Sequence, residues 1–425
     1  MTQEEHFIRA AGGTALPTSP AALRRANLSL VLRRLRDNVS SRADIAEATG
    51  LHRATVSNLM AELLDRRLVR EVGIEHAGAV GRPPRAVALH GAHVGALGME
   101  INVDYISVHG TDLSGRALVE RRVGFDTVGS GPDRSLRRLG MVAREAIEAM
   151  KRAGAVPAGI GVAVPALVDV ARGVVTFAPN LHWRDLPLAA RLSDTLGPLG
   201  IPVMVDNDAN LAALAEHTSG VAAGAPHLVY LTGEVGVGGG IVVDGRLLRG
   251  ADGFSGEVGH LPVDPAGARC GCGRHGCWET KVGLAALVRM AMPEQAYELA
   301  GLPVSDPEER ATEIARGLAG GDHRMLEAVA EVGRWLGLGG SIVVNLLNPR
   351  VIVVGGYFAT LAEWLLPHAQ AELERLVVAG PAAQCRFTAS NLGFGAASRG
   401  AASMVINQLI DDPTTIMDLL PLPTS

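Results

Sequence analysis

Residues 256–279 read GEVGHLPVDPAGARCGCGRHGCWE, and the rest of the chain is best interpreted outward from this stretch. It places one histidine, His260, ahead of three closely spaced cysteines, Cys270, Cys272 and Cys277. One imidazole and three thiolates form a closed tetrahedral ligand set for zinc, and the interleaved glycines let the backbone fold tightly around an ion. Because four protein ligands leave no position for water, we expect one structural Zn²⁺ per chain and no hydrolytic role for it.

Two other interpretations of this stretch stay open. His275 could replace His260 as the fourth ligand, although it lies inside the tight cysteine loop, and the three thiols could be buried without metal. The whole chain has 4 cysteines, which favours metal ligation in a reducing compartment over a disulfide framework. The polar, acidic opening MTQEEHFIRA lacks an apolar signal region, and no clean membrane span is found. We therefore expect a cytoplasmic protein with no membrane partner.

The zinc stretch lies within a long α/β region. From about residue 91 to 410, short apolar strands alternate with helices. One helix is expected at about 134–152, with one apolar side formed by Leu136, Leu139, Val142, Ala146 and Ile147. Strand hairpins at 97–108 and 228–243 lie about 130 residues apart and are each followed by a Gly-Arg turn, which indicates a weak internal duplication. Two similar halves of mixed strands and helices predict an α/β protein of two lobes with a cleft between them.

Three further motifs accompany residues 231–279. They are Pro179-Asn180-Leu181, the run DNDAN at 206–210, and the segment 349–356. Together these motifs resemble the ROK family, which comprises repressors, open reading frames and sugar kinases. The resemblance covers roughly residues 92–405, and the zinc motif is its most specific part. It implies an actin-like, RNase-H-type fold of two lobes with a sugar in the cleft.

The resemblance also implies which side chains contact the sugar. They are Asn180, Asn207, Asp208, Glu257, His260 and Glu279. Such side chains suit a sugar because carboxylates accept hydrogen bonds from its paired hydroxyls and amides both donate and accept. If His260 binds zinc through one ring nitrogen, the other is free to meet a hydroxyl. For Asp208 alone, capping of the following helix is an equally good explanation.

The departures from the family's kinases predict binding without catalysis. Those kinases begin their first hairpin with Asp-x-Gly-Gly-Thr, which approaches the phosphates of ATP, whereas residues 100–104 here are EINVD. The second phosphate hairpin has Glu234-Val235-Gly236 where the kinases tend to carry Gly-Thr-Gly. Side-chain bulk and like charge at both positions oppose ATP. We therefore assign no catalytic residue and expect a non-enzymatic sugar sensor.

Ahead of this region, residues 20–90 predict a winged helix-turn-helix. Helices are expected at 21–36, where Leu23, Leu28, Leu32 and Leu35 recur at helical spacing, and at 41–49, with Ser41 as N-cap, Asp44 three residues later and Gly50 in the turn that follows. A third helix is expected at 52–66 with Val56, Leu59, Leu63 and Leu64 inward, followed by two strands and a basic loop at 81–85. The first 90 residues carry 13 Arg against 9 acidic residues, a balance of +4, so the rest of the −5 chain carries −9. The expected DNA contacts are Arg42, Arg53, Thr55, Ser57, Asn58, Arg82 and Arg85. A structural or protein-docking three-helix module is the alternative.

These interpretations give the following organisation: residues 1–19 form a flexible N-terminal segment, 20–90 the DNA-binding domain, 91–410 the ROK sugar-binding domain and 411–425 a C-terminal tail. The function predicted is a transcriptional repressor of sugar-utilisation genes. It binds a duplex DNA operator as a homodimer or homotetramer and responds to a sugar effector. An active sugar kinase with a DNA-binding appendage is the alternative, and a repressor that answers to a protein partner is a third possibility.

Overall fold

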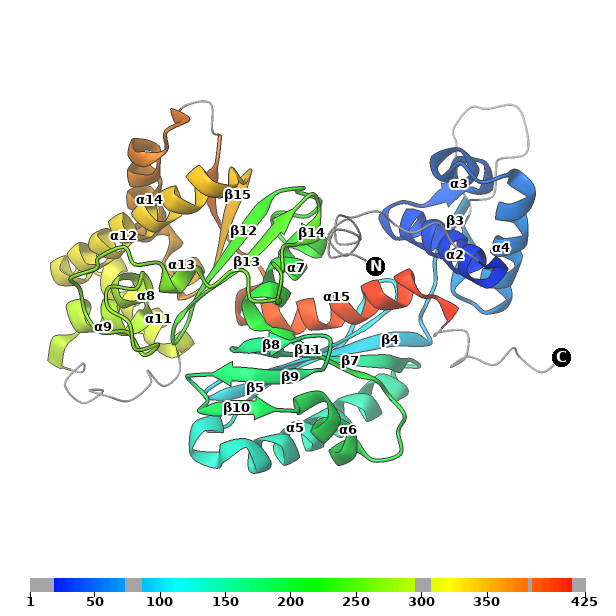
Figure 1. The fold of residues 1–425 in the computed structure, drawn as a ribbon, viewed down its shortest axis with the longest axis horizontal. Helices are drawn as coiled ribbons and strands as arrows, with labels where there is room; N and C mark the ends of the chain where they lie inside the picture. The colour runs from blue at the N-terminus through cyan, green and yellow to red at the C-terminus, as the bar shows by residue number, and fades with distance from the viewer. Residues whose placement is uncertain (1–18, 73–85, 295–306, 381–383, 415–425) are drawn as a thin grey trace, which may run out of the picture. The chain divides into compact units, whose positions relative to one another are not determined.

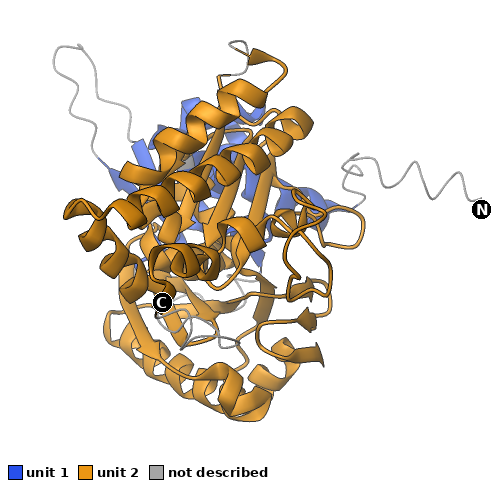
Figure 2. Cartoon of the chain, turned by 90° about the vertical axis from the view of Figure 1, so that its left-hand side faces the viewer, with its two compact units in different colours: residues 1–92, 407–425 blue, residues 93–406 orange. Residues whose placement is uncertain are grey.

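The fold comes from a computed structural model that describes residues 19–72, 86–294, 307–380 and 384–414. The chain forms two compact units (Figure 2). One comprises residues 1–92 and 407–425, and the other comprises residues 93–406. Within the described residues, no helix combines the length and the apolar character needed to cross a membrane.

The smaller unit has the element order of a winged helix-turn-helix (Figure 1). Its elements are α2 (Pro20–Asp37), β1 (Ser40–Ser41), α3 (Arg42–Thr49), α4 (Arg53–Asp65), β2 (Val69–Val72) and β3 (Ala86–Leu89). The three strands pair in the order β1-β3-β2. Ser41 and Asp44 form a capping box that starts α3, and Gly50 ends it in the left-handed conformation, with φ of 69°. These two local signals set the turn between α3 and α4.

The core of this unit follows the predicted apolar stripes except at Leu23 and at Leu64, which is half-buried. Leu28, Leu32 and Leu35 are buried on α2, and α4 buries Val56, Leu59, Met60 and Leu63. The prediction was wrong for Leu23, which is 51% exposed. Leu23 lies five residues before Leu28, a spacing that turns it away from the face of α2 on which Leu28 and Leu32 are buried.

The larger unit contains two five-stranded sheets of matching topology. The first has the order β11-β7-β4-β5-β6 and the second β14-β13-β12-β15-β16. In each sheet an antiparallel hairpin, β4–β5 or β12–β13, is extended by parallel strands, β7 and β11 or β15 and β16. The matching pattern agrees with the internal duplication expected from the two hairpins.

The first lobe is built around a five-stranded sheet whose strands β4 and β5 are buried throughout. The strands are β4 (Val94–Ile101), β5 (Tyr105–Asp112), β6 (Ala117–Gly124), β7 (Val156–Val164) and β11 (Val203–Asn207), with helices α5 (Thr127–Arg152) and α6 (Leu188–Leu196). A small sheet of β8 (Leu167–Asp169), β9 (Val174–Ala178) and β10 (Trp183–Leu186) adjoins it. All eight residues of β4 and of β5 are buried, and the predicted α5 positions Leu136, Leu139, Val142, Ala146 and Ile147 face this core.

The second lobe packs long helices on its sheet. Its strands are β12 (Leu228–Gly233), β13 (Val237–Val243), β14 (Arg246–Leu247), β15 (Val351–Gly356) and β16 (Arg386–Ala389). Its helices include α9 (Leu284–Ala291), α11 (Pro307–Ala319), α12 (His323–Leu347) and α14 (Ala362–Leu376). The fully buried Trp278 closes the core beside Gly339 of α12, where a Cβ would lie 2.0 Å from the indole ring. Trp278 directly follows the last cysteine of the zinc motif, so this packing anchors the cysteine loop.

Two helices position the cleft end of β11. Helix α7 (Asp208–Ser219) starts where β11 ends, and α15 (Ala396–Asp411) packs beside both. A Cβ at Gly400 of α15 would lie 1.7 Å from the carbonyl oxygen of Leu211, and one at Gly98 of β4 would lie 1.9 Å from that of Ser398. Only glycine permits such close approach. The helix that begins with Asp208 therefore packs closely against α15, and it also packs against β13, where a Cβ at Gly240 would lie 2.3 Å from the Ala209 carbonyl oxygen.

Candidate functional site

A cavity of about 490 Å³ opens between the residues of the two lobes. Its volume lies within the roughly 300–1,000 Å³ typical of small-molecule sites. All six residues expected to contact a sugar line it: Asn180, Asn207, Asp208, Glu257, His260 and Glu279. The structure thus brings together side chains that are up to 99 positions apart in the sequence. Their roles toward a sugar remain predictions.

Asn207 and Asp208 lie at the junction of β11 and α7. Asn207 is the N-cap of α7, since its Oδ1 accepts a hydrogen bond from the Asn210 N–H at 3.0 Å. Its Nδ2 donates to the Ala166 carbonyl at 3.2 Å. Asp208 is the first residue of α7, and its Oδ1 accepts from the Ala209 N–H at 2.9 Å. The N-cap role considered for Asp208 therefore belongs to Asn207, and Asp208 keeps a carboxylate oxygen for the cleft.

The carboxyl of Asp208 has a strongly perturbed pKa. Burial raises this pKa to about 7, and the nearby carboxyls of Glu100 and Glu257 act in the same direction. Burial likewise raises the pKa of Glu257, with a smaller contribution from Glu279, while His260 opposes the rise. Perturbed carboxyls in a cleft are typical of functional sites.

Glu257, His260 and Glu279 form a chain of polar groups along one wall. The 3₁₀ turn η1 (Val258–His260) brings Glu257 Oε2 to 3.9 Å from His260 Nε2. On its other side, His260 Nδ1 lies 3.6 Å from Glu279 Oε1. Gly256 has φ of 102°, and a Cβ there would lie 2.4 Å from the Gly239 carbonyl oxygen, so the turn into Glu257 requires glycine.

The four predicted zinc ligands are close enough to share one ion. The ligand atoms of His260, Cys270, Cys272 and Cys277 all lie within 4.8 Å of one another. Cys270 Sγ is 3.7 Å from His260 Nδ1, and the sulfur atoms of Cys272 and Cys277 are 3.6 Å apart. Tetrahedral zinc, with Zn–S near 2.3 Å, separates its ligand atoms by roughly 3.7 Å. The donor set therefore fits zinc, with Nδ1 of His260 on the metal side and Nε2 facing Glu257.

His275 and Glu279 lie at the margin of this cluster. His275 is exposed and is not part of the four-ligand group, so the structure favours His260 as the nitrogen ligand. The Cys270 thiol donates a hydrogen bond to Glu279 Oε1 at 2.7 Å. Glu279 also lines the cavity. It therefore connects the cysteine cluster directly to the cleft.

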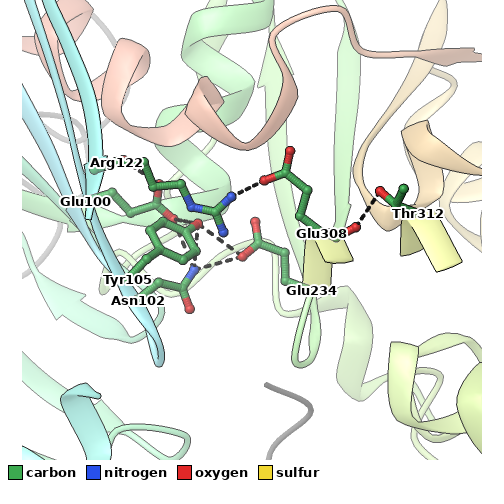
Figure 3. A network of polar contacts seen from close by, with 8 residues as sticks. Glu100, Asn102, Tyr105, Arg122, Glu234, Glu308 and Thr312 are labelled. Atoms are coloured by element: carbon green, nitrogen blue, oxygen red, sulfur yellow. Dashed lines mark hydrogen bonds and ion pairs between the residues drawn. The ribbon is translucent and has the colours of Figure 1, made fainter. Parts of the chain in front are cut away.

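A buried polar network joins the tips of the two hairpins (Figure 3). Asn102 Nδ2 donates to Glu234 Oε2 at 2.8 Å, and the Tyr105 hydroxyl donates to Glu100 Oε1 at 2.6 Å. The same hydroxyl lies 3.2 Å from Glu234 Oε2. Glu100, Asn102 and Tyr105 belong to the β4–β5 hairpin, whereas Glu234 follows β12. The network thus ties the first lobe to the second.

A cation–π contact and an ion pair extend this network. The Arg122 guanidinium on β6 lies 4.0 Å from the centroid of the Tyr105 ring and forms an ion pair with Glu308 of α11. Sequence reasoning singled out Asn102 and Glu234 but missed Tyr105, Arg122 and Glu308. No local spacing could reveal these partners, because Arg122 and Glu308 are 186 positions apart.

Three carboxyls crowd this end of the cleft. Burial raises the pKa of Glu234 well above its ordinary value, and Glu100 and Asp208 raise it further. Asp104, which we expected to direct its charge toward phosphate, is not among the residues that line the cavity. Glu234 supplies the carboxyl group there instead.

The smaller unit presents the expected outward side chains on α4. Arg53, its first residue, and Asn58 are exposed, while Thr55 and Ser57 are half-buried. Arg42 begins α3 and lies 3.5 Å from Glu71 of β2 in an ion pair. Arg82 and Arg85 lie outside the described residues. Contacts of all seven side chains with DNA remain predictions.

Both units match known protein families. Residues 96–408 match the ROK family. The chain belongs to the ROK family. Residues 30–73 match the IclR helix-turn-helix domain, which confirms the helix-turn-helix expected in this ROK protein.

Relatives and solved structures repeat this combination. The xylose repressor of Bacillus spizizenii is 28% identical over 390 residues, covering 92% of this chain and 97% of the relative. The crystal structure of a ROK family transcriptional regulator, a homologue of the Escherichia coli MLC protein, aligns with a TM-score of 0.77 and 26% identity over 94% of this chain and 99% of that one.

Kinases of the family match a smaller part. The ROK glucokinase of Streptomyces griseus, solved with glucose and AMPPNP, aligns with a TM-score of 0.61 and 29% identity. The match covers 98% of that enzyme but 73% of this chain. The predicted kinase-like, two-lobed fold is confirmed. The match to a regulator across nearly the whole chain supports regulation over catalysis.

Proposed function

We propose that this ROK protein is a transcriptional repressor of sugar-utilisation genes whose cleft binds a sugar without phosphorylating it. The observation that carries this proposal is the hydrogen-bonded contact of Glu234 with Asn102 and Tyr105. It joins the two hairpin tips that, by resemblance, ROK kinases use to hold the phosphates of ATP. A helix-turn-helix unit on the same chain would bind the operator DNA.

The contacts around Glu234 oppose nucleotide binding in two ways. A phosphate group would have to displace the Asn102 amide, which donates a hydrogen bond to Glu234, and the Tyr105 hydroxyl, which lies 3.2 Å from the same carboxyl. It would also approach the buried carboxyls of Glu100, Glu234 and Asp208. Burial raises the pKa of all three, and Glu100 raises the pKa values of Glu234 and Asp208 further. Without in-line placement of a phosphoryl group, Asp208 has nothing to catalyse as a general base.

The remaining cleft offers a complete set of sugar contacts. Asp208 and Glu257 would accept hydrogen bonds from ring hydroxyls, Asn180 and Asn207 would supply amides, and Glu279 closes the wall. Zinc on Cys270, Cys272, Cys277 and His260 Nδ1 would hold the imidazole rigid and direct Nε2 into the cleft. Pentoses and hexoses are the effector class, in line with the xylose repressor among the relatives and the glucose bound by the glucokinase.

The output requires two DNA-binding units at a fixed spacing. Arg53, Thr55, Ser57 and Asn58 on α4 would contact base edges, while Arg42, Arg82 and Arg85 would contact phosphates or the minor groove. A homodimer or homotetramer in the cytoplasm would present two such units to an operator with two half-sites. Sugar binding shifts the equilibrium between arrangements of the lobes and so changes operator affinity.

Two assays on the purified full-length chain test the proposal. A thermal-shift screen with mono- and disaccharides, including D-xylose and D-glucose, should identify stabilising sugars, and MgATP should add no further shift. A coupled ADP-release assay with the same sugars should stay at background while a ROK glucokinase, run in parallel, turns over. Sugar-dependent ADP release at ordinary kinase rates would overturn the proposal and restore the kinase alternative.

A further inference from the structure

An ion pair outside the cavity lining joins the two segments that carry the sugar contacts. Arg249 lies in the loop between β14 and η1, and its Nη2 is 2.6 Å from Oδ2 of Asp206 on β11. The Asp206 side chain is 1% exposed and that of Arg249 is 35% exposed. Neither residue lines the cavity. The pair therefore connects β11 to the loop that leads to Glu257 without lining the cavity between them.

Each member of the pair also holds the backbone of its own wall. Asp206 Oδ1 accepts the N–H of Asn207 at 2.8 Å, immediately before Asp208. The carbonyl of Arg249 accepts the N–H of Ser255 at 3.1 Å, which closes the loop just ahead of Glu257. One carboxylate thus fixes the Asn207–Asp208 wall and, through the guanidinium, the base of the loop that leads to Glu257.

The hydrogen bonding of Arg249 indicates that this residue fixes the separation of two segments more than it stabilises the fold. Its Nη1 is buried and has no hydrogen-bond partner among the described residues. A guanidinium whose buried Nη1 is unbonded recovers little of the free energy spent on desolvating that atom, and apolar replacements of buried ion pairs are often neutral or stabilising. What the planar, charge-assisted bond provides is a fixed separation between the two segments.

We propose that Asp206 and Arg249 are positioning residues that set the distance between the Asn207–Asp208 wall and the Glu257–His260 wall of the sugar cleft. This inference rests on the proposed sugar-sensing function. Loss of the pair would leave every sugar contact in place but relax their spacing, and small displacements of binding groups weaken affinity strongly.

Hydrogen exchange tests the positioning itself, without any ligand. In the full-length chain, Arg249→Gln should speed amide exchange at Ser255 and Asn207 about tenfold or more, because the interactions that hold these amides are weakened. Arg116→Gln is the matched control. Arg116 pairs at 3.0 Å with Asp112, whose side chain is 2% exposed, and neither residue lines the cavity.

Calorimetry with D-xylose and D-glucose then tests the consequence. Arg249→Gln and Asp206→Asn should each raise the Kd of the bound sugar about tenfold. The Kd of the double variant should not exceed that of the single variant with the higher Kd, because both substitutions remove the same interaction. Arg116→Gln should match the wild type. Wild-type exchange at Ser255 and Asn207 in Arg249→Gln, or an equal loss of sugar affinity in Arg116→Gln, would overturn the inference. A wild-type chain that binds no sugar would instead refute the proposed function, and the exchange data would still decide whether the pair orders these segments.

Discussion

Asp208→Asn is expected to strengthen the fold while weakening the sugar response. Burial, then Glu100 and Glu257, raise the pKa of Asp208 to about 7. Asparagine has nearly the same shape but cannot ionise, so it removes the unfavourable buried charge. It also removes the acceptor that a sugar hydroxyl would use. The two effects have opposite signs, which distinguishes a binding residue from a residue that only supports the structure.

The stability effect follows from the pKa. A rise from 3.8 to about 7 corresponds to roughly 4 kcal/mol at most, and because Asp208 is partly open to the cleft we take about 2 kcal/mol. The folded state holds the proton more tightly than the unfolded state does. The contribution of this proton binding to the free energy of unfolding is therefore fully present below pH 4 and is lost as the pH rises through 7. Relative to Asp208→Asn, the wild type should lose about 2 kcal/mol of unfolding free energy between pH 4 and pH 8.

The sugar affinity should change in the opposite direction with pH. With a pKa of about 7, roughly a tenth of Asp208 is ionised at pH 6 and nine tenths at pH 8. If the carboxylate accepts a sugar hydroxyl, wild-type affinity should rise up to about tenfold over this interval. Asp208→Asn should remove that component of the pH dependence and weaken binding by roughly 1.5–3 kcal/mol, the value of a charge-assisted hydrogen bond.

Urea unfolding at pH 4, 6 and 8 measures the stability effect, and isothermal titration calorimetry at pH 6, 7 and 8 measures the sugar affinity. The sugars are D-xylose and D-glucose, and Asp112→Asn serves as a control carboxyl away from the cleft. A less stable Asp208→Asn protein at pH 8, together with unchanged sugar affinity, would refute the reasoning. Kinase turnover abolished by Asp208→Asn would assign this residue to catalysis instead.

The other predictions concern the metal and the DNA. Purified protein should contain about one zinc per chain by elemental analysis. Cys272→Ser should lose both the metal and the sugar response, while Cys385→Ser should keep both. A metal-free protein that still responds to sugar would contradict the zinc assignment. Arg53→Ala should relax sequence choice by about 1–3 kcal/mol in anisotropy titrations, whereas Arg82→Ala should weaken all duplexes similarly and reduce the salt slope by about one. Binding that is insensitive to salt would argue against both Arg assignments.

Local chemistry made much of this molecule predictable. The zinc ligands lie within 18 consecutive residues, so their spacing alone indicated the cluster. Gly50 and the capping box of Ser41 and Asp44 are short-range signals, and both are found as expected. The stripe on α5 followed from helical periodicity, because one face of that helix packs on a fully buried sheet.

Contacts between distant segments could not be predicted in the same way. The partners of Glu234 and Arg122 depend on how the two lobes meet, and no spacing in the sequence records this. The pair of Asp206 and Arg249 likewise joins segments 43 positions apart. Asn207, not Asp208, caps α7 because Asp208 is already the first residue of the helix, which leaves the residue before it at the N-cap position.

A single binding measurement tests the central claim most directly. A duplex selected by the full-length chain from a random-sequence pool is titrated by fluorescence anisotropy with increasing D-xylose or D-glucose, in the absence of any nucleotide. We predict that one of these sugars changes the operator Kd at least about fivefold, which is a coupling free energy near 1 kcal/mol. An operator Kd that neither sugar changes until ATP is added would contradict the account.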